Sequence, residues 1–345
     1  MNVRLALLAA GLCLGPAASL HAQPAPDALP RLSASQDRAS VVGVSSGGYM
    51  AAQLAVAWPS RFAGLGVAAA GPWACARGEL GLALGQCMFT RLGTPDLEAI
   101  QARYRDYRER DLVGSPAALA ELRAHVWHGG ADATVAPDVG EALVAQLSGW
   151  LADPEAQLRV VRDPQAGHGW PVDEDQATPD GTLANCQAGG GSHLLACDRD
   201  LAAEALNWLH GPPAGDPDGA GRLRRFDQSD FEARGLADAG YVFVPEGCEA
   251  GGCPVTVALH GCEMSAAEGD ERFVRHSGLN ARAAAEPRIV LYPQAEASLA
   301  NPKGCWDWWG FAESTWQLDP MHDTRQGSQV EALMGMLDRL QADAD

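Results

Sequence analysis

Lysine is nearly absent from this chain. Lys303 is the single lysine in 345 residues, and Asp and Glu outnumber Lys and Arg by 44 to 25. The resulting formal charge of −19 opposes binding to nucleic acid and to anionic membranes, because both of those partners are themselves negatively charged. We therefore expect no nucleic-acid partner and no membrane partner. The same charge is compatible with a neutral substrate, or with solubility alone.

Long apolar runs are missing beyond the N-terminus. The one candidate is Leu5–Leu14, which follows Arg4 and precedes a plausible cleavage site at Leu20-His21-Ala22. This pattern is typical of a secretory signal peptide over residues 1–22. A membrane anchor is the alternative, but the run is too short to cross a bilayer and Pro16 interrupts it. We expect a secreted protein, either extracellular or periplasmic.

Cysteines with the spacing of metal ligands are also lacking. No C-x-x-C pair or Cys/His cluster occurs, so we expect no metal, and nothing indicates another cofactor. Cys13 lies in the signal peptide, which leaves eight of the nine cysteines. An even number in an exported chain indicates disulfides. The sequence leaves their connectivity open, but proximity along the chain suggests Cys75–Cys87, Cys186–Cys197 and Cys248–Cys253, with Cys262–Cys305 remaining.

A G-x-S-x-G motif is present near the start of the chain. The apolar run Val41–Val44 predicts a buried strand, and the Ala-rich segment Tyr49–Ala57 predicts a helix. Between them, Gly43-Val44-Ser45-Ser46-Gly47 matches the sharp strand-to-helix turn that exposes a nucleophilic serine. A purely structural Gly-Ser turn is the alternative. The setting favours Ser45 as the nucleophile.

Apolar segments of strand length alternate with helical patterns along most of the chain. This alternation predicts a mostly parallel central sheet with helices on both faces. The expected strands are 41–44, 62–70, 124–132 (ending in a turn), 158–161, 240–245, 254–259 and 288–293, and the expected helices are 49–57, 97–110, 117–122, 139–151, 200–209, 273–285 and 329–342.

The Pro- and Gly-rich segment 211–221 is the clearest linker. It could separate two domains, but we favour one catalytic domain over 39–345 after a loose arm at 23–38. An α/β-hydrolase normally places a strand with a His-Gly loop before its nucleophile strand. Here that strand appears at Val255–Cys262, after the linker. We therefore predict a circularly permuted α/β-hydrolase fold, with the linker at the permutation junction.

Ester hydrolysis needs a base and an orienting acid beside the serine. Asp132 follows an apolar strand and lies in a turn, and His168 lies in a Gly-flanked loop after the next strand. The order Ser45, Asp132, His168 is the one that the G-x-S-x-G motif predicts. Asp138 and Asp163 compete for the role of the acid.

The oxyanion that forms during hydrolysis needs backbone donors. His128-Gly129-Gly130 resembles an oxyanion loop, but it ends the strand that carries the acid. His260-Gly261-Cys262 fits better, so we expect the N–H groups of Ser46 and Cys262 to be the donors. His260 could instead be a packing histidine that shapes this loop, which is compatible with the loop's role as a donor.

Three tryptophans lie close together in the loop that Cys305 begins. Trp306, Trp308 and Trp309 could belong to the core or could line a cleft. If the segment is extended, alternation places Trp306 and Trp308 on one side. We expect Trp306, Trp308 and His260 to contact the substrate.

The motifs together resemble poly(3-hydroxybutyrate) depolymerases, especially the single-domain, circularly permuted fungal-type enzymes. The matching segments are GVSSGGYMA at 43–51, HGGAD at 128–132, AGH at 166–168, LHGC at 259–262 and NPKGCWDW at 301–308. The resemblance implies an α/β-hydrolase with the triad Ser45, Asp132 and His168. It also implies the Ser46 and Cys262 amides as oxyanion hole, and a Trp of the Cys305-Trp306 segment in the substrate crevice.

The resemblance implies a secreted, monomeric serine esterase acting on poly(3-hydroxybutyrate) or its oligomers. Feruloyl and acetyl-xylan esterases have related folds, so a carbohydrate esterase is the alternative. A non-catalytic binding module is a third reading, and the intact triad argues against it.

Overall fold

The computed structural model describes residues 26–344, apart from 38, 175–182, 214, 216–218, 270 and 314–319. The expected signal peptide at 1–22 lies outside the described residues. Within the described part of the chain, none of the helices combines the length and the apolar character needed to cross a membrane.

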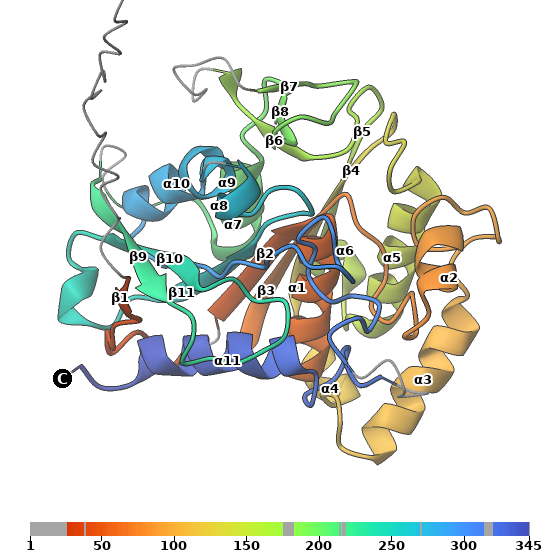
Figure 1. Ribbon diagram of the computed structural model, residues 1–345, viewed down its shortest axis with the longest axis horizontal. Helices are drawn as coiled ribbons and strands as arrows, with labels where there is room; N and C mark the ends of the chain where they lie inside the picture. The colour runs from red at the N-terminus through yellow and green to blue at the C-terminus, as the bar shows by residue number, and fades with distance from the viewer. Residues whose placement is uncertain are drawn as a thin grey trace, which may run out of the picture.

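A nine-stranded central sheet organises the molecule (Figure 1). From edge to edge it runs β1 (Asp27–Ala28), β9 (Gly221–Asp227), β10 (Ala239–Pro245), β12 (Ile289–Tyr292), β11 (Val255–Leu259), β2 (Ala39–Val44), β3 (Phe62–Ala68), β4 (Arg123–Gly129) and β5 (Leu158–Asp163). All neighbouring pairs are parallel except those that β10 makes with β9 and β12. A small second sheet has the order β6 (Trp170–Val172), β8 (Leu194–Ala196), β7 (Ala184–Asn185).

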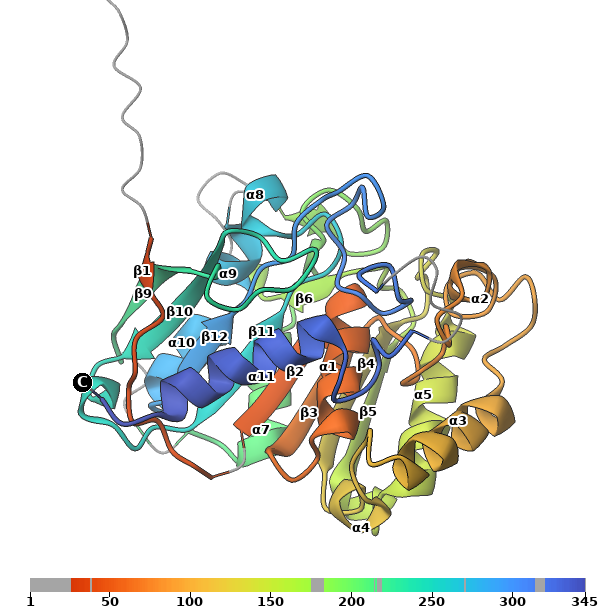
Figure 2. The ribbon, with the colours of Figure 1, turned by 60° about the horizontal axis from the view of Figure 1, so that its bottom comes forward.

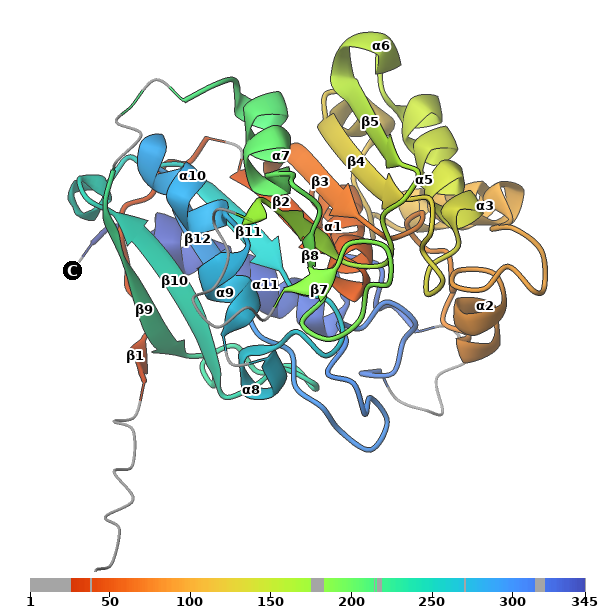
Figure 3. The ribbon, with the colours of Figure 1, turned by 90° about the horizontal axis from the view of Figure 1, so that it is seen from above.

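Helices cover both faces of the central sheet. One face packs against α1 (Ser46–Ala57), α3 (Leu97–Glu109), α5 (Pro137–Trp150) and α11 (Ser328–Gln341), and the other against α7 (Leu201–His210), α9 (Arg272–His276) and α10 (Leu279–Ala285). Figure 2 shows α11 in front of the sheet, and Figure 3 shows α7, α9 and α10 in front of it. The remaining helices are short: α2 (Leu80–Gly85), α4 (Pro116–Leu119), α6 (Pro154–Gln157), α8 (Ala266–Gly269) and a 3₁₀ turn at Cys248–Ala250. The α/β fold class is thus confirmed.

The middle of the sheet is buried on both faces, which explains its near-continuous apolar sequence. Every residue of β2 is buried, and so is every residue of α1, which packs directly beside it. A helix that is apolar all round belongs in a protein core. The start of α1 is therefore held rigidly at the end of β2.

Residues far apart in the sequence meet at β2. Its neighbours are β3, from the same half of the chain, and β11, which follows the linker. Ser40 Oγ and Thr256 Oγ1 lie 2.7 Å apart in a buried hydrogen bond between β2 and β11. The strand that carries the His-Gly loop, β11, thus lies directly beside the nucleophile strand β2 in the sheet. In the sequence β11 follows β2 instead of preceding it, which is the circularly permuted order.

Three segments differ from the sequence-based expectation. Residues 26–37 are packed rather than loose: Leu29 is fully buried, and the Leu32 N–H donates to the Leu340 carbonyl at 3.2 Å, next to α11. The helix expected over 273–285 is divided into α9 and α10, because Gly278 has φ +83° and interrupts the helical backbone. Strand β9 was not expected, because four of its seven residues are charged and no apolar run of strand length marks it; it lies next to the short edge strand β1.

Candidate active site

Ser45 lies in the turn between β2 and α1. Its φ is 55° and its ψ is −122°, a strained conformation for a residue with a side chain. Its N–H donates to the Ala68 carbonyl at 2.9 Å. A Cβ at Gly47 would lie 2.3 Å from the carbonyl oxygens of Leu259 and His260, so only glycine fits where α1 meets the end of β11. The tight turn therefore presents Ser45 at the carboxyl edge of the sheet.

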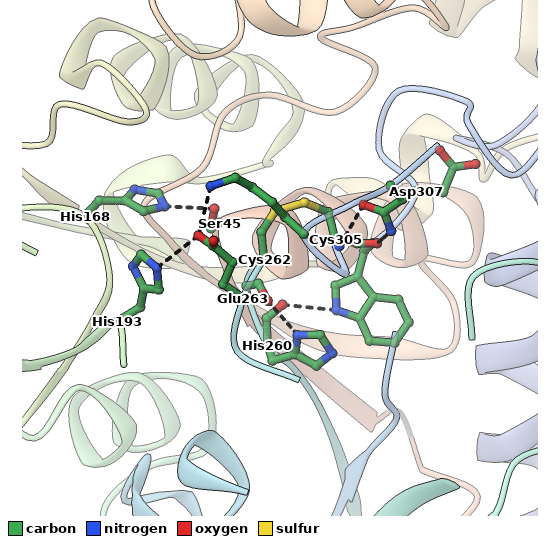
Figure 4. The surroundings of a disulfide bond; sticks show 12 residues. Ser45, His168, His193, His260, Cys262, Glu263, Cys305 and Asp307 are labelled. Atoms are coloured by element: carbon green, nitrogen blue, oxygen red, sulfur yellow. Dashed lines mark hydrogen bonds and ion pairs between the residues drawn. A yellow bond between two sulfur atoms is a disulfide. The ribbon is translucent and has the colours of Figure 1, made fainter. Parts of the chain in front are cut away.

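Three side chains from separate loops form one hydrogen-bonded chain. Ser45 Oγ lies 2.9 Å from His168 Nε2 (Figure 4), and His168 Nδ1 lies 2.8 Å from Asp132 Oδ2. The other carboxylate oxygen of Asp132 accepts the N–H groups of Thr134 and Val135, each at 2.8 Å. Asp132 is 5% exposed and His168 is 7% exposed. A buried, fixed carboxylate orients the imidazole so that Nε2 can take the serine proton.

The structure does not bring the two competing carboxylates into this chain. Asp138 is exposed in the first turn of α5. Asp163 ends β5, where its Oδ2 lies 3.9 Å from Arg199 Nε.

A second histidine, His128, packs beside Asp132. Its Nε2 lies 2.9 Å from the Val135 carbonyl oxygen and 3.5 Å from Asp132 Oδ2. Its Nδ1 has no hydrogen-bond partner among the described residues, and a Cβ at Gly140 would come within 2.3 Å of it. Burial lowers the pKa of His128, although the charge of Asp132 opposes this. The ring is therefore neutral, and Nε2 must carry its proton because it faces a carbonyl.

The backbone of Ser46 and Cys262 borders the space in front of Ser45. Ser46 begins α1, and Cys262 follows the end of β11. Among the hydrogen bonds of the described residues, neither of these N–H groups is used as a donor. Unused N–H groups beside a helix N-terminus are suited to a developing oxyanion.

A cavity of about 450 Å³ opens onto Ser45 and His168. One wall is apolar and is formed by Leu80, Leu84, Met88, Phe89, Trp308 and Trp309. The ring of Trp308 stacks on that of Tyr49, with centroids 4.4 Å apart and planes 12° apart. Trp308 therefore lies where a substrate contact was expected.

Two other expected substrate contacts do not reach this cavity. Trp306 is 0% exposed, and its Nε1 donates to the His260 carbonyl at 3.0 Å. His260 is also 0% exposed, and its Nε2 accepts the Ala295 N–H at 3.1 Å. The structure thus places Trp306 and His260 in the core, away from the cavity lining, with hydrogen bonds to the backbone of neighbouring segments. Their contact instead holds the loop that leads to Cys262.

Sequence reasoning missed three polar residues in the cavity wall. The His193 ring meets the His168 ring edge-on, with centroids 6.0 Å apart. Glu263 directly follows Cys262, and Lys303 lies two residues before Cys305. Glu263 and Lys303 line the cavity and form an ion pair of 3.0 Å. The one available signal was that the chain places its single lysine inside a recognisable motif.

Four disulfides link the eight cysteines. The bonded pairs are Cys75–Cys87, Cys186–Cys197, Cys248–Cys253 and Cys262–Cys305, the pairs that proximity along the chain suggests. The last of these joins the end of β11 to the Trp-rich loop beside Ser45 (Figure 4).

A serine in a sharp strand-to-helix turn, bonded to a histidine that a buried carboxylate orients, defines a serine hydrolase of the α/β-hydrolase class. The model of the prolyl oligopeptidase family matches residues 28–180, which contain this serine, histidine and carboxylate.

Comparison with known proteins narrows this class. The chain is 34% identical to a polyhydroxybutyrate depolymerase of Talaromyces funiculosus, over 92% of this chain and 94% of that protein. It is 30% identical to a poly(3-hydroxybutyrate) depolymerase of Delftia acidovorans, over 98% of this chain and 66% of that protein. The crystal structure of the PHB depolymerase from Penicillium funiculosum superposes with a TM-score of 0.81 at 32% identity, covering 91% of this chain and 98% of that one. A serine-to-alanine PHB depolymerase complexed with an R3HB trimer gives the same values. The chain belongs to the polyhydroxybutyrate depolymerase family.

Proposed function

We propose that this chain is a secreted, monomeric esterase that hydrolyses poly(3-hydroxybutyrate) or its oligomers through an acyl-enzyme. Ser45 is the nucleophile, His168 is the general base and then the general acid, and Asp132 orients His168. The N–H groups of Ser46 and Cys262 stabilise the oxyanion. The hydrogen-bonded chain from Ser45 to Asp132, inside an apolar cavity, is the observation that carries this proposal.

The shape and chemistry of the cavity support a polyester over a carbohydrate ester. Sugars need many hydrogen-bonding partners, whereas the wall beside Ser45 presents aliphatic and aromatic side chains. Leu80, Leu84, Phe89 and Leu92 are exposed on or near this rim, which suits a water-insoluble substrate. The related proteins are PHB depolymerases as well.

The four disulfides are compatible with the proposed secretion. Light scattering of the purified protein tests whether it is a monomer.

The test compares Ser45→Ala with Ser46→Ala. Loss of the nucleophile should lower kcat on a p-nitrophenyl ester and on polymer granules by at least about a thousandfold, with the fold intact by circular dichroism. Ser46→Ala keeps the backbone N–H and should stay active. Full activity in Ser45→Ala would reject the nucleophile, and faster release of ferulate from an arabinoxylan fragment than of 3-hydroxybutyrate from granules would reject the substrate.

A further inference from the structure

The cavity beside Ser45 has one charged corner. Glu263 Oε2 lies 3.0 Å from Lys303 Nζ and 3.8 Å from His193 Nε2. Figure 4 shows His193 and Glu263 close to His168 and Ser45. The cavity is otherwise lined mainly by apolar side chains such as Leu80, Leu84 and Phe89, and Lys303 is the one Lys or Arg among the described residues that line it. A bound chain with one anionic terminus would therefore find its cationic partner at this corner.

The backbone beneath Lys303 is fixed relative to the catalytic loop. Its carbonyl accepts the Glu263 N–H at 2.7 Å, next to the disulfide between Cys262 and Cys305. Asn301 is buried, and its side chain both accepts the N–H of Cys305 at 3.0 Å and donates to its carbonyl at 2.7 Å. The side chain of Lys303 can thus move while its backbone is held in place next to the loop that carries Cys262.

The charged corner lies on the side of the leaving group. In the proposed mechanism, His168 donates a proton to the departing ester oxygen, so the departing unit lies on the His168 side. His193 packs edge-on against His168 and approaches Glu263, which holds Lys303. A departing 3-hydroxybutyrate unit carries its own carboxyl group only a CH(CH₃)–CH₂ pair beyond that oxygen, and Lys303 lines the same cavity as Ser45 and His168.

We propose that Lys303 binds the free carboxylate of the leaving unit, so that the site cuts acid-terminated 3-hydroxyalkanoate oligomers at the bond nearest their carboxyl end. This inference rests on the proposed function and adds a substrate class to it. Lys303 carries the only ammonium side chain in a molecule of charge −19, which otherwise repels an anionic oligomer.

The ion pair between Lys303 and Glu263 can exchange partners at little cost. The two side chains are 61% and 47% exposed, and ion pairs exposed to this degree contribute little to stability because water screens them. A substrate carboxylate can therefore replace Glu263 as the partner of the ammonium group. Glu263 competes with the substrate for Lys303, so removing each charge should have opposite effects.

The experiment uses the (R)-3-hydroxybutyrate trimer as free acid and as methyl ester, which differ only in the terminal charge. The readout is the ratio of kcat/KM for the acid to that for the methyl ester. Lys303→Met should lower this ratio about threefold to fivefold, the effect expected of one partly exposed charge pair, and high salt should reduce the difference. Lys303→Arg should keep the ratio, and Glu263→Gln should raise it.

Each outcome decides between the possibilities. If Lys303→Met lowers kcat/KM for both trimers equally, Lys303 only supports the loop and the proposal is overturned. If Glu263→Gln lowers the ratio, the competition between Glu263 and the substrate is wrong. If the wild-type protein hydrolyses the methyl ester but its ratio is unchanged in Lys303→Met, the carboxylate site fails while the proposed function stands. If it hydrolyses neither trimer, the proposed function itself fails.

Discussion

Asp132 is held at both of its carboxylate oxygens. Two backbone N–H groups bind Oδ1, while His168 and His128 both face Oδ2. The Nε2–H of His128 donates to the Val135 carbonyl at 2.9 Å, in the turn that follows Asp132, and the ring lies 3.5 Å from Oδ2. His128 therefore supports the turn that holds Asp132. The side chain of His128 thus acts on Ser45 only through Asp132.

Substitutions of His128 test this positioning role. His128→Leu removes the hydrogen bond to the Val135 carbonyl in the Asp132 turn and should lower kcat/KM on a p-nitrophenyl ester about tenfold, because small displacements of a catalytic group are costly. His128→Gln can place an amide N–H near the same point and should retain most of the activity. In an Asp132→Asn background, His128→Leu should cause little further loss, as expected for residues that act as a unit. Additive losses would show that His128 acts independently of Asp132.

The sequence indicated some of these residues and not others, for physical reasons. Ser45, Asp132 and His168 stand in glycine-rich turns after apolar strands, and that local context can be read without a structure. Whether Trp306 faces the core or the cavity depends on what surrounds it, here the carbonyl of His260. The corner formed by Glu263 and Lys303 joins two loops that are distant in sequence, so no local pattern revealed it.

At the scale of elements, the disulfide between Cys262 and Cys305 joins β11 to the Trp-rich loop. It closes a loop of 43 residues, for which chain entropy gives a stabilisation on the order of 4 kcal/mol. It also fixes the Cys262 N–H, the proposed oxyanion donor, and such a donor must lie near 3 Å from the developing charge, about the length of an ordinary hydrogen bond. Breaking this disulfide should therefore lower kcat by more than the loss of stability alone would explain.

Cys305→Ser and Cys253→Ser form a matched pair of variants. Both break one disulfide, but Cys253 lies far along β11 from the site, at the 3₁₀ turn before that strand. Cys305→Ser should lower kcat more than tenfold, because losing one oxyanion donor costs about a hundredfold or more and misplacing it costs part of that. Cys253→Ser should lower the melting temperature with kcat nearly unchanged. Equal kcat in the two variants would contradict a positioning role for the Cys262–Cys305 bridge.

The long central elements were predictable and the edges were not. Strands β2, β3, β4 and β11 are apolar runs of strand length, and burial on both faces leaves them few other structures. Strand β9 and residues 26–37 lie at the edge, where charged side chains are tolerated and pairing with distant segments decides the structure.

At the scale of the whole molecule, buried histidines should make the fold sensitive to acid. Burial, with smaller effects from Arg159 and Arg199, lowers the pKa of His125 to about 4, and burial lowers that of His260 to about 4. An unfolded histidine titrates at about 6.5. Between these values the unfolded chain binds protons that the folded chain does not, so stability falls as the pH drops through this window.

Urea unfolding at pH 7 and at pH 5 measures this effect. Each histidine should lower the free energy of unfolding by about 2 kcal/mol between these pH values. His125→Gln should remove its own share of this loss, about 2 kcal/mol. Equal free energies at the two pH values in the wild-type protein would contradict the burial of these rings as neutral groups.

The position of β2 between the two halves of the chain has a consequence for biosynthesis. Ser40 in β2 pairs with Thr256 in β11, a separation of 216 residues. A ribosome therefore releases the nucleophile strand long before it makes the strand that completes its ladder. Until then one edge of β2 is open, and an open edge invites pairing with other chains. Among the proposed catalytic groups the amide of Cys262 is synthesised last, so a nascent or truncated chain that ends before it holds Ser45, His168 and Asp132 without the second proposed oxyanion donor.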